Sequence, residues 1–154
     1  MLMRTRKKKL LIPEENYKSD FAPLSGFYNY HVKGKDISVS LDEIQGFGVT
    51  LEPKKRQEIA NVNVNSLMTN TIIFSSSKKK YNVKNLIWTI RCLVAHPENI
   101  EEKSINGVKY YNICCSTKDK ITGKVIPTMK GLVARDLWPK FTEQLINKIK
   151  EEKI

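Results

Sequence analysis

NVKNLIWTIRCLVA, residues 82–95, carries the clearest structural signal in the sequence. Its apolar residues recur every three or four positions, as they do on one face of an α-helix. They are Val83, Leu86, Ile87, Ile90, Leu93 and Val94. Asn82 is a favourable N-cap, and Pro97 stops the helix because the residue before a proline avoids helical dihedral angles. The pattern predicts a helix that buries one whole face.

A hairpin, a further strand and a second helix are predicted after this segment. Asn106-Gly107 is the preferred two-residue hairpin turn, here between residues 103–105 and 108–114. Pro127 favours an edge position for the next strand, over 124–132. The helix is expected from about Asp136 to Glu152, because apolar residues lie four positions apart there: Leu137, Phe141, Leu145 and Ile149.

The segments before residue 82 carry weaker signals. Pro53 is typical of a helix start and predicts a helix from about 54 to 72. The alternation in residues 37–41 favours a short strand, whereas Ser40 with Glu43 forms a capping box that favours a helix.

A chain of 154 residues with 40% hydrophobic residues is long enough for one domain with a core of its own. Residues 1–9 are expected to be a flexible basic arm, and 10–154 a single globular domain. The fold class we predict is α+β: a mostly helical domain with a small antiparallel hairpin or sheet between the 82–95 helix and the C-terminal helix.

Charge is the most pronounced feature of the composition. Lys and Arg outnumber Asp and Glu by 27 to 16, which gives a net charge of +11. Such a balance favours a polyanionic partner, most of all RNA, because phosphate attracts Lys and Arg over long distances. An alternative origin of the positive charge is an AT-rich genome, which enriches a protein in Lys, Asn and Ile. The clustering of the charge favours the polyanion, and the clusters are Arg4 to Lys9, Lys54 to Arg56 and Lys78 to Lys80.

The cysteines and histidines predict neither disulfides nor a metal centre. The chain has Cys92, the adjacent pair Cys114 and Cys115, no CxxC spacing and two histidines, so we expect no metal and no cofactor. Adjacent strand residues face opposite sides of a sheet, which favours a structural role for the pair. Since no apolar run approaches the roughly 18–20 residues of a membrane span, we expect no membrane contact and a cytoplasmic location.

Arg91 and His96 are the candidate catalytic residues. Guanidinium is matched to phosphate oxygens, and imidazole is the commonest general acid or base near neutral pH. Together they supply what RNA cleavage through the 2′-hydroxyl needs. On an ideal helix the two side chains would point about 140° apart. They converge only if the helix loosens near His96 or if a dimer shares the site. The simpler alternative is a histidine that favours the negative end of the helix dipole.

Residues 86–96, LIWTIRCLVAH, resemble the Arg-x4-6-His helix of the HEPN (higher eukaryotes and prokaryotes nucleotide-binding) family. The resemblance covers about residues 54–150. It implies a mostly helical homodimer in which two motif copies form a metal-independent ribonuclease cleft, as in toxins and phage-defence proteins, some of which pair with an antitoxin protein. Arg91 would bind the scissile phosphate and His96 would be the acid–base. The sequence departs from the family pattern at Cys92, where members commonly have Asn, Asp or His.

We therefore predict a HEPN-like endoribonuclease acting as a homodimer, with the nucleic acid also bound by Lys78, Lys79, Lys80 and Lys84. The first alternative is a non-catalytic basic protein of a phage or mobile element that binds nucleic acid, which Cys92 favours. The second is an adaptor that works through protein contacts, with the Tyr-rich segment 27–31 and Trp88 as interface anchors.

Overall fold

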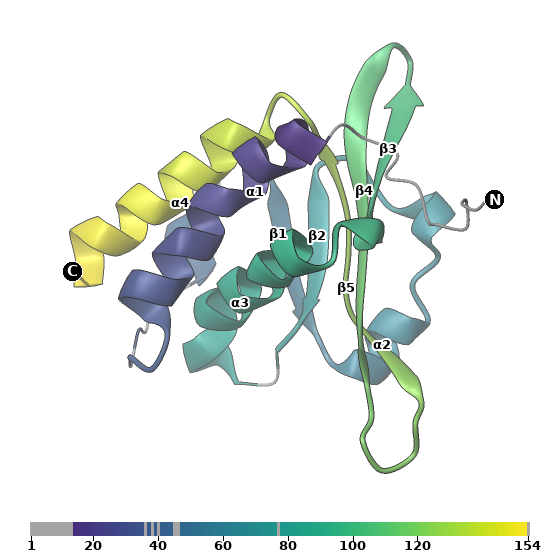
Figure 1. Ribbon diagram of the computed structural model, residues 1–154, viewed down its shortest axis with the longest axis horizontal. Coiled ribbons are helices and arrows are strands. Elements are labelled where there is room, and N and C mark those ends of the chain that lie inside the picture. Colours follow the sequence, from purple (N-terminus) through teal and green to yellow (C-terminus); the bar gives the residue numbers. More distant parts are fainter. Residues whose placement is uncertain are drawn as a thin grey trace, which may run out of the picture.

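In the part of the chain that the computed structural model describes, five strands form one mixed sheet, in the order β1-β2-β5-β4-β3 (Figure 1). The structure describes residues 14–35, 37, 39, 41–44, 47–76 and 78–153, so the predicted basic arm 1–9 lies outside the described residues. The strands are β1 (Thr50–Lys54), β2 (Thr71–Ser75), β3 (Ile100–Ile105), β4 (Val108–Lys118) and β5 (Val125–Ala134). The α-helices are α1 (Glu14–Phe27), α2 (Arg56–Ala60), α3 (Asn82–Ala95) and α4 (Trp138–Lys153).

The prediction of a mostly helical domain with a small antiparallel sheet is wrong. β1 and β2 run parallel and are joined by the segment that contains α2, whereas β2, β5, β4 and β3 pair antiparallel. The α+β class is retained, but the sheet is five-stranded, mixed and central to the fold. β1 and β2 were not predicted, and they extend the expected hairpin and strand into a full sheet.

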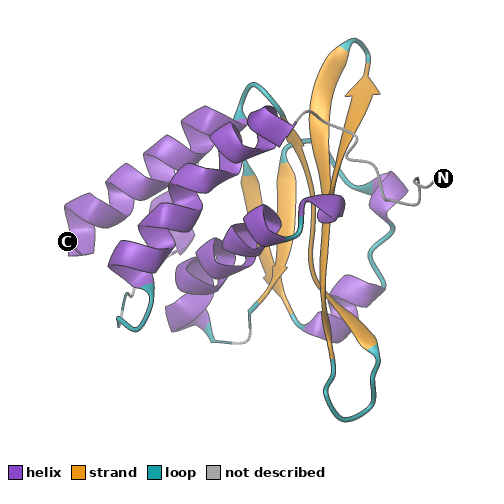
Figure 2. Cartoon of the chain, viewed as in Figure 1, coloured by secondary structure: helices purple, strands orange, loops and turns teal. Residues whose placement is uncertain are grey.

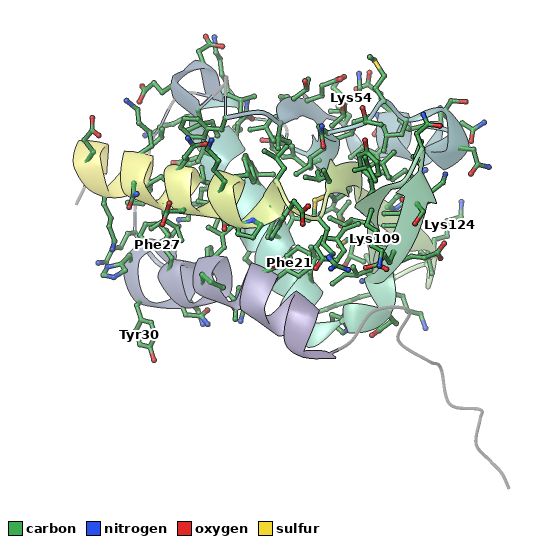
Figure 3. All side chains as sticks on the ribbon, turned by 90° about the horizontal axis from the view of Figure 1, so that it is seen from above. Phe21, Phe27, Tyr30, Lys54, Lys109 and Lys124 are labelled. Carbon is green, nitrogen blue, oxygen red and sulfur yellow. The ribbon has the colours of Figure 1, made fainter. Side chains whose placement is uncertain are left out.

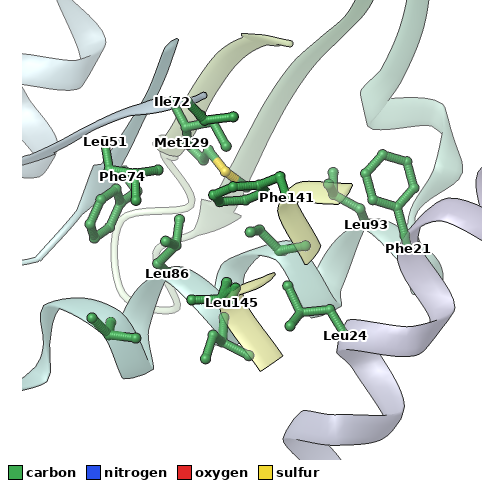
Figure 4. Close-up of a cluster of buried hydrophobic side chains, with 14 of the residues drawn as sticks. Phe21, Leu24, Leu51, Ile72, Phe74, Leu86, Leu93, Met129, Phe141 and Leu145 are labelled. Atoms are coloured by element: carbon green, nitrogen blue, oxygen red, sulfur yellow. The ribbon is translucent and has the colours of Figure 1, made fainter. Parts of the chain in front are cut away.

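Helices α1, α3 and α4 cover one face of this sheet, and α2 lies on the other (Figures 1 and 2). The main core forms between the three helices and the strands. It includes Phe21 and Leu24 of α1, Leu86 and Leu93 of α3, Phe141 and Leu145 of α4, and Leu51, Ile72, Phe74 and Met129 of the sheet (Figure 4). β2 from Thr71 to Phe74 and β5 from Thr128 to Val133 are buried on both faces, and α2, whose Ile59 is buried, contacts both strands. This explains why the three apolar residues Ile72, Ile73 and Phe74 follow one another in β2.

The helix predicted over 54–72 is wrong. Pro53 lies inside β1, and only the five residues of α2 are α-helical in that range. β1 is an edge strand that pairs on one side with β2, and an edge strand tolerates proline because one row of its backbone groups has no partner.

The segment 10–50 contains a helix that the sequence did not predict. α1 holds Pro23 and Gly26, both of which usually argue against a helix, yet its buried residues Phe21, Leu24 and Phe27 lie three apart. After a π-helical turn, η1 (Tyr28–Val32), the chain continues to a 3-10 turn, η2 (Leu41–Ile44). The strand expected over 37–41 is absent at Ile37, Val39 and Leu41, and Ser40 lies outside the described residues.

The elements predicted after residue 95 are largely confirmed. Asn106 and Gly107 form the turn between β3 and β4, with positive φ angles of 52° and 81°. β5 is a central strand, not the edge strand expected from Pro127. Pro127 is tolerated because β2 pairs only with residues 129–132 of β5, and because the β4 ladder shifts register beside it.

One residue of α1 joins α1, the sheet and α4. The Asp20 carboxylate accepts a hydrogen bond from the Tyr111 hydroxyl of β4. The backbone carbonyl of Asp20 accepts a second hydrogen bond, from Trp138 Nε1 of α4 (2.9 Å). Tyr111 and Trp138 are fully buried, and Phe21 packs against both rings. This junction fixes α1 and α4 on the same face of the sheet.

Candidate functional site

Arg91 lies on the last turns of α3, where residues of η1 hold its side chain. Its Nε donates a hydrogen bond to Asn29 Oδ1 (3.0 Å), and its guanidinium carbon lies 5.6 Å from the centre of the Tyr28 ring. The Asn29 contact occupies Nε, and the guanidinium also hydrogen-bonds the Cys92 thiol, so its remaining N–H groups are left for other ligands. Arg91 is therefore fixed in direction while it keeps the part of the fork that matches phosphate oxygens.

The π-helical turn η1 is what brings these two residues to Arg91. η1 continues directly from α1, and π-helical turns are frequent at functional sites. Tyr28 is buried, which raises the pKa of its phenol, while the Arg91 charge opposes that rise. Tyr30, in the same turn, is 81% exposed and points away from the protein (Figure 3). Asn29 and Tyr28 were not predicted as site residues, because they lie about 60 positions from Arg91 in the chain.

His96 is the residue at which α3 ends. Its backbone has left the helical region, with φ −131° and ψ 68°, although its N–H still donates to the Cys92 carbonyl (3.1 Å). The side chain is largely exposed, and Nδ1 lies 3.4 Å from Glu98 Oε2. A carboxylate beside an imidazole is the usual means of orienting a general base.

The two candidate catalytic residues have different neighbours. Arg91 contacts η1, and His96 contacts Glu98 just beyond α3; among the described residues no hydrogen bond or ion pair joins Arg91 to His96. The helix does end at Ala95, so one of the two conditions stated for convergence, a departure from helical geometry at His96, is present.

Cys92 lies beside Arg91 and is half-buried. Burial raises the pKa of its thiol, and the Arg91 charge and hydrogen bond oppose that rise. Cys115 of β4 is buried with a pKa of about 12, raised by burial and then by the neighbouring thiols of Cys92 and Cys114. Cys114 is exposed, so the prediction that the adjacent pair faces opposite sides is confirmed. Neither buried thiol has the lowered pKa of a nucleophile.

The four lysines predicted to bind nucleic acid divide into two groups. Lys78, Lys79 and Lys80 are exposed just before α3, and Lys80 Nζ lies 5.5 Å from the Tyr81 ring centre. Lys84 is different, because its Nζ donates a 2.6 Å hydrogen bond to the Lys35 carbonyl. Lys84 shares a helix face with Arg91, seven positions on, and both side chains contact the segment that follows α1.

A pocket of about 450 Å³ opens between α3 and the ends of β1 and β2. We call it the Trp88 pocket. It is lined by Lys55, Arg56, Gln57, Ser75, Ser76, Asn85, Trp88, Thr89 and Thr128. Trp88 is 44% exposed, in contrast to the fully buried Trp138. The pocket therefore combines two cations, an accessible indole and several hydroxyl and amide groups, and sequence reasoning had not joined these residues into one site.

The described part of the chain contains neither a metal-binding cluster nor a membrane-spanning helix. No group of three or more His, Cys, Asp or Glu side chains is placed to hold a metal ion there. None of the described helices is long and apolar enough to cross a membrane.

Comparisons of the chain with protein-family models, curated proteins and solved structures gave no match.

Proposed function

We propose that this protein is a metal-independent endoribonuclease that resembles the HEPN family, with Arg91 and His96 as its active pair. The observation that carries the proposal is the fixed guanidinium of Arg91 near the end of a helix that terminates at an exposed, carboxylate-paired His96. The mostly helical fold implied by the resemblance is not the fold of this chain. The proposal therefore rests on these residues and on the net charge of +11.

The reaction is a transesterification within the RNA strand. The 2′-hydroxyl loses its proton to a base and attacks the adjacent phosphorus, and the bond from phosphorus to the 5′-oxygen breaks as that oxygen takes up a proton. The products are a 2′,3′-cyclic phosphate and a 5′-hydroxyl. His96, oriented by Glu98, serves as the acid or base, and Arg91 stabilises the added charge on the phosphate oxygens in the transition state.

A homodimer completes the site in this proposal. In the HEPN family, two motif helices face each other across a cleft. By that resemblance, the Arg91 of one copy and the His96 of the other act on one phosphate. A second copy removes the need for the two side chains of one α3 to converge. A role as a toxin or in phage defence, with an antitoxin protein as partner, belongs to the same proposal.

Asn29 is a positioning residue in this scheme. The HEPN pattern has a polar residue beside its arginine, and here Cys92 occupies that position while Asn29 holds Arg91 Nε from another element. Asn29→Ala should therefore lower kcat by about tenfold with little change in KM, since misplacement of a catalytic group acts mainly on the chemical step. In the Asn29→Ala variant, Cys92→Asn should restore most of the lost kcat. In the parent, the same substitution should change kcat little. A structural role for Asn29 alone would not produce that rescue.

Cleavage of RNA by the purified full chain in EDTA tests the proposal. The parent should release fragments that end in 2′,3′-cyclic phosphate. His96→Ala should lower the rate by at least about 100-fold, the contribution of a general acid–base, and Arg91→Lys by about 100-fold, through loss of charge stabilisation in the transition state. His31→Gln is the matched control, because His31 is the other histidine and packs on Phe27 (ring centres 5.3 Å apart). Cleavage by His96→Ala at the parent rate would refute the assignment.

A nucleic-acid-binding protein without turnover is the second candidate. The half-buried thiol of Cys92, at a position where the family has a polar side chain, favours it. In that case RNA affinity should fall steeply with salt concentration, and no variant or buffer should yield cleavage products.

A further inference from the structure

We infer that the Trp88 pocket binds one nucleotide of a single-stranded nucleic acid, with the base stacked on Trp88 and the phosphate held by Arg56 and Lys55. The inference rests on the proposed function only for the class of ligand, a nucleic acid. It assigns a binding site to residues outside the Arg91 and His96 pair.

The indole of Trp88 is the first element of this site. Residues that precede and follow it on α3 are buried, among them Ile87, Thr89 and Ile90, yet Trp88 remains 44% exposed at the pocket. An exposed tryptophan costs solubility and contributes little to the core. A base can stack on its face whatever the sequence, because every base has a π-face.

Two cations, Lys55 and Arg56, also line the pocket. Lys55 and Arg56 follow β1 directly and are exposed, and neither belongs to an ion pair that the described residues form. The nearby Asp119 carboxylate has its pKa lowered chiefly by backbone hydrogen bonds from Ile121 and Thr122, with Arg56 a minor cause. Arg56 therefore retains guanidinium nitrogens for a phosphate.

The polar floor of the pocket is ordered by hydrogen bonds. The Ser76 hydroxyl bonds to Asn82 Oδ1 and accepts a hydrogen bond from Asn85 Nδ2 (3.1 Å). Among the described residues, Asn85 Oδ1 and the second amide hydrogen have no partner, so one acceptor and one donor remain for the edge of a base.

The size and position of the pocket fit a nucleotide of a strand. About 450 Å³ lies within the range of about 300–1,000 Å³ usual for ligand pockets. Lys78, Lys79 and Lys80 follow the lining residue Ser76 in the chain and extend the positive surface beyond the pocket. His96 lies eight residues along the chain from Trp88, or about 12 Å along the helix axis. The end of α3 is therefore within reach of a strand that has one base on Trp88.

Tryptophan fluorescence tests the inference directly. The chain has two tryptophans, and Trp138 is fully buried, so quenching by a ligand reports Trp88. The ligand is a 2′-O-methyl oligouridine, which binds but has no free 2′-hydroxyl for cleavage. We expect quenching in the parent and a loss of affinity of about 5- to 150-fold in Trp88→Ala, the usual range for one stacked base. Trp88→Phe should keep affinity within about threefold and lose the quenching.

The phosphate contact is tested with a matched pair of charge variants. Arg56→Gln should weaken binding and lower the slope of log affinity against log salt by about one, whereas Lys150→Gln, the same loss of charge on the exposed face of α4, should change neither appreciably. Equal effects of the two variants would overturn the assignment of the phosphate to Arg56.

Two further arms identify the ligand and separate this inference from the nuclease proposal. Uridine monophosphate is titrated in parallel with the oligouridine. Tighter binding of the oligouridine identifies a strand as the ligand, whereas equal affinities identify a free nucleotide. Either result supports the Trp88 pocket as a binding site. Quenching without RNA cleavage refutes the nuclease alone. Cleavage without quenching, or parent affinity in Trp88→Ala, refutes the pocket alone.

Discussion

Removal of the Tyr111 hydroxyl should destabilise the protein by an amount that depends on pH. Tyr111 is fully buried and donates its hydroxyl hydrogen to the Asp20 carboxylate. A hydrogen bond to a charged group contributes about 1.5–3 kcal/mol, and Tyr111→Phe creates no cavity of note. Because Asp20 is only partly buried, we expect about 2 kcal/mol at neutral pH, which corresponds to a fall in Tm of about 4–8 °C.

The sign of the pH dependence follows from the pKa of Asp20. Burial raises this pKa, and the Tyr111 hydrogen bond offsets only part of the rise, so the pKa stays above its usual value. The bond is thus strongest to the ionised carboxylate, so its contribution is present above the folded pKa of Asp20 and is lost as the pH falls through it. The cost of Tyr111→Phe should shrink on acidification.

Urea unfolding at pH 7.5 and pH 3.5, followed by circular dichroism, measures this cost. Tyr110→Phe is the matched control, because Tyr110 precedes Tyr111 in β4 and its side chain points to the other face of the sheet. We expect it to change the free energy of unfolding by no more than about 0.5 kcal/mol. An equal cost of Tyr111→Phe at both pH values, or an equal cost of the control, would show that the hydroxyl does not act through Asp20.

Three further predictions concern the helices, the sheet and the thiols. Gly26→Ala should stabilise the protein by about 0.5–1 kcal/mol in thermal unfolding, because α1 has open space for a Cβ there; a loss of stability would contradict the helical assignment. Gly131→Ala should destabilise it by about 1–3 kcal/mol, since the added Cβ would lie 3.3 Å from Ile72 Cγ1 in β2; an unchanged Tm would refute that packing. A thiol reagent at pH 8 should modify Cys114 in the native protein and Cys115 only after unfolding, as mass spectrometry of peptides can show, because burial holds the Cys115 pKa at about 12.

The parts of the fold that sequence predicted best are those with one strong periodicity. α3 and α4 carry apolar stripes that the structure buries, and Asn106-Gly107 dictates its turn through left-handed backbone angles. α1 was missed because Pro23 and Gly26 argue against a helix, although tertiary packing of Phe21 and Leu24 outweighs them.

The β1 and β2 strands show a different limit. Pro53 is compatible with a helix start and with an edge strand, and only the place of β1 in the sheet decides between them. For the candidate sites, residue types were predictable and their neighbours were not. Arg91 was identified from its motif, but Asn29 reaches it across 62 positions of the chain. Likewise, Arg56 and Trp88 meet at one pocket only because β1 pairs with β2 beneath α3.

The junction at Asp20 has a consequence for how the chain acquires its structure. Asp20 and Trp138 are 118 positions apart, so a ribosome that adds about 5–20 residues per second needs about 6–24 s to deliver the second after the first. During that interval Phe21 and Leu24 have no α4 to pack against. Nascent chains of this protein should therefore engage chaperones through α1, and folding should be slow for a domain of this size because its contacts are so distant in sequence.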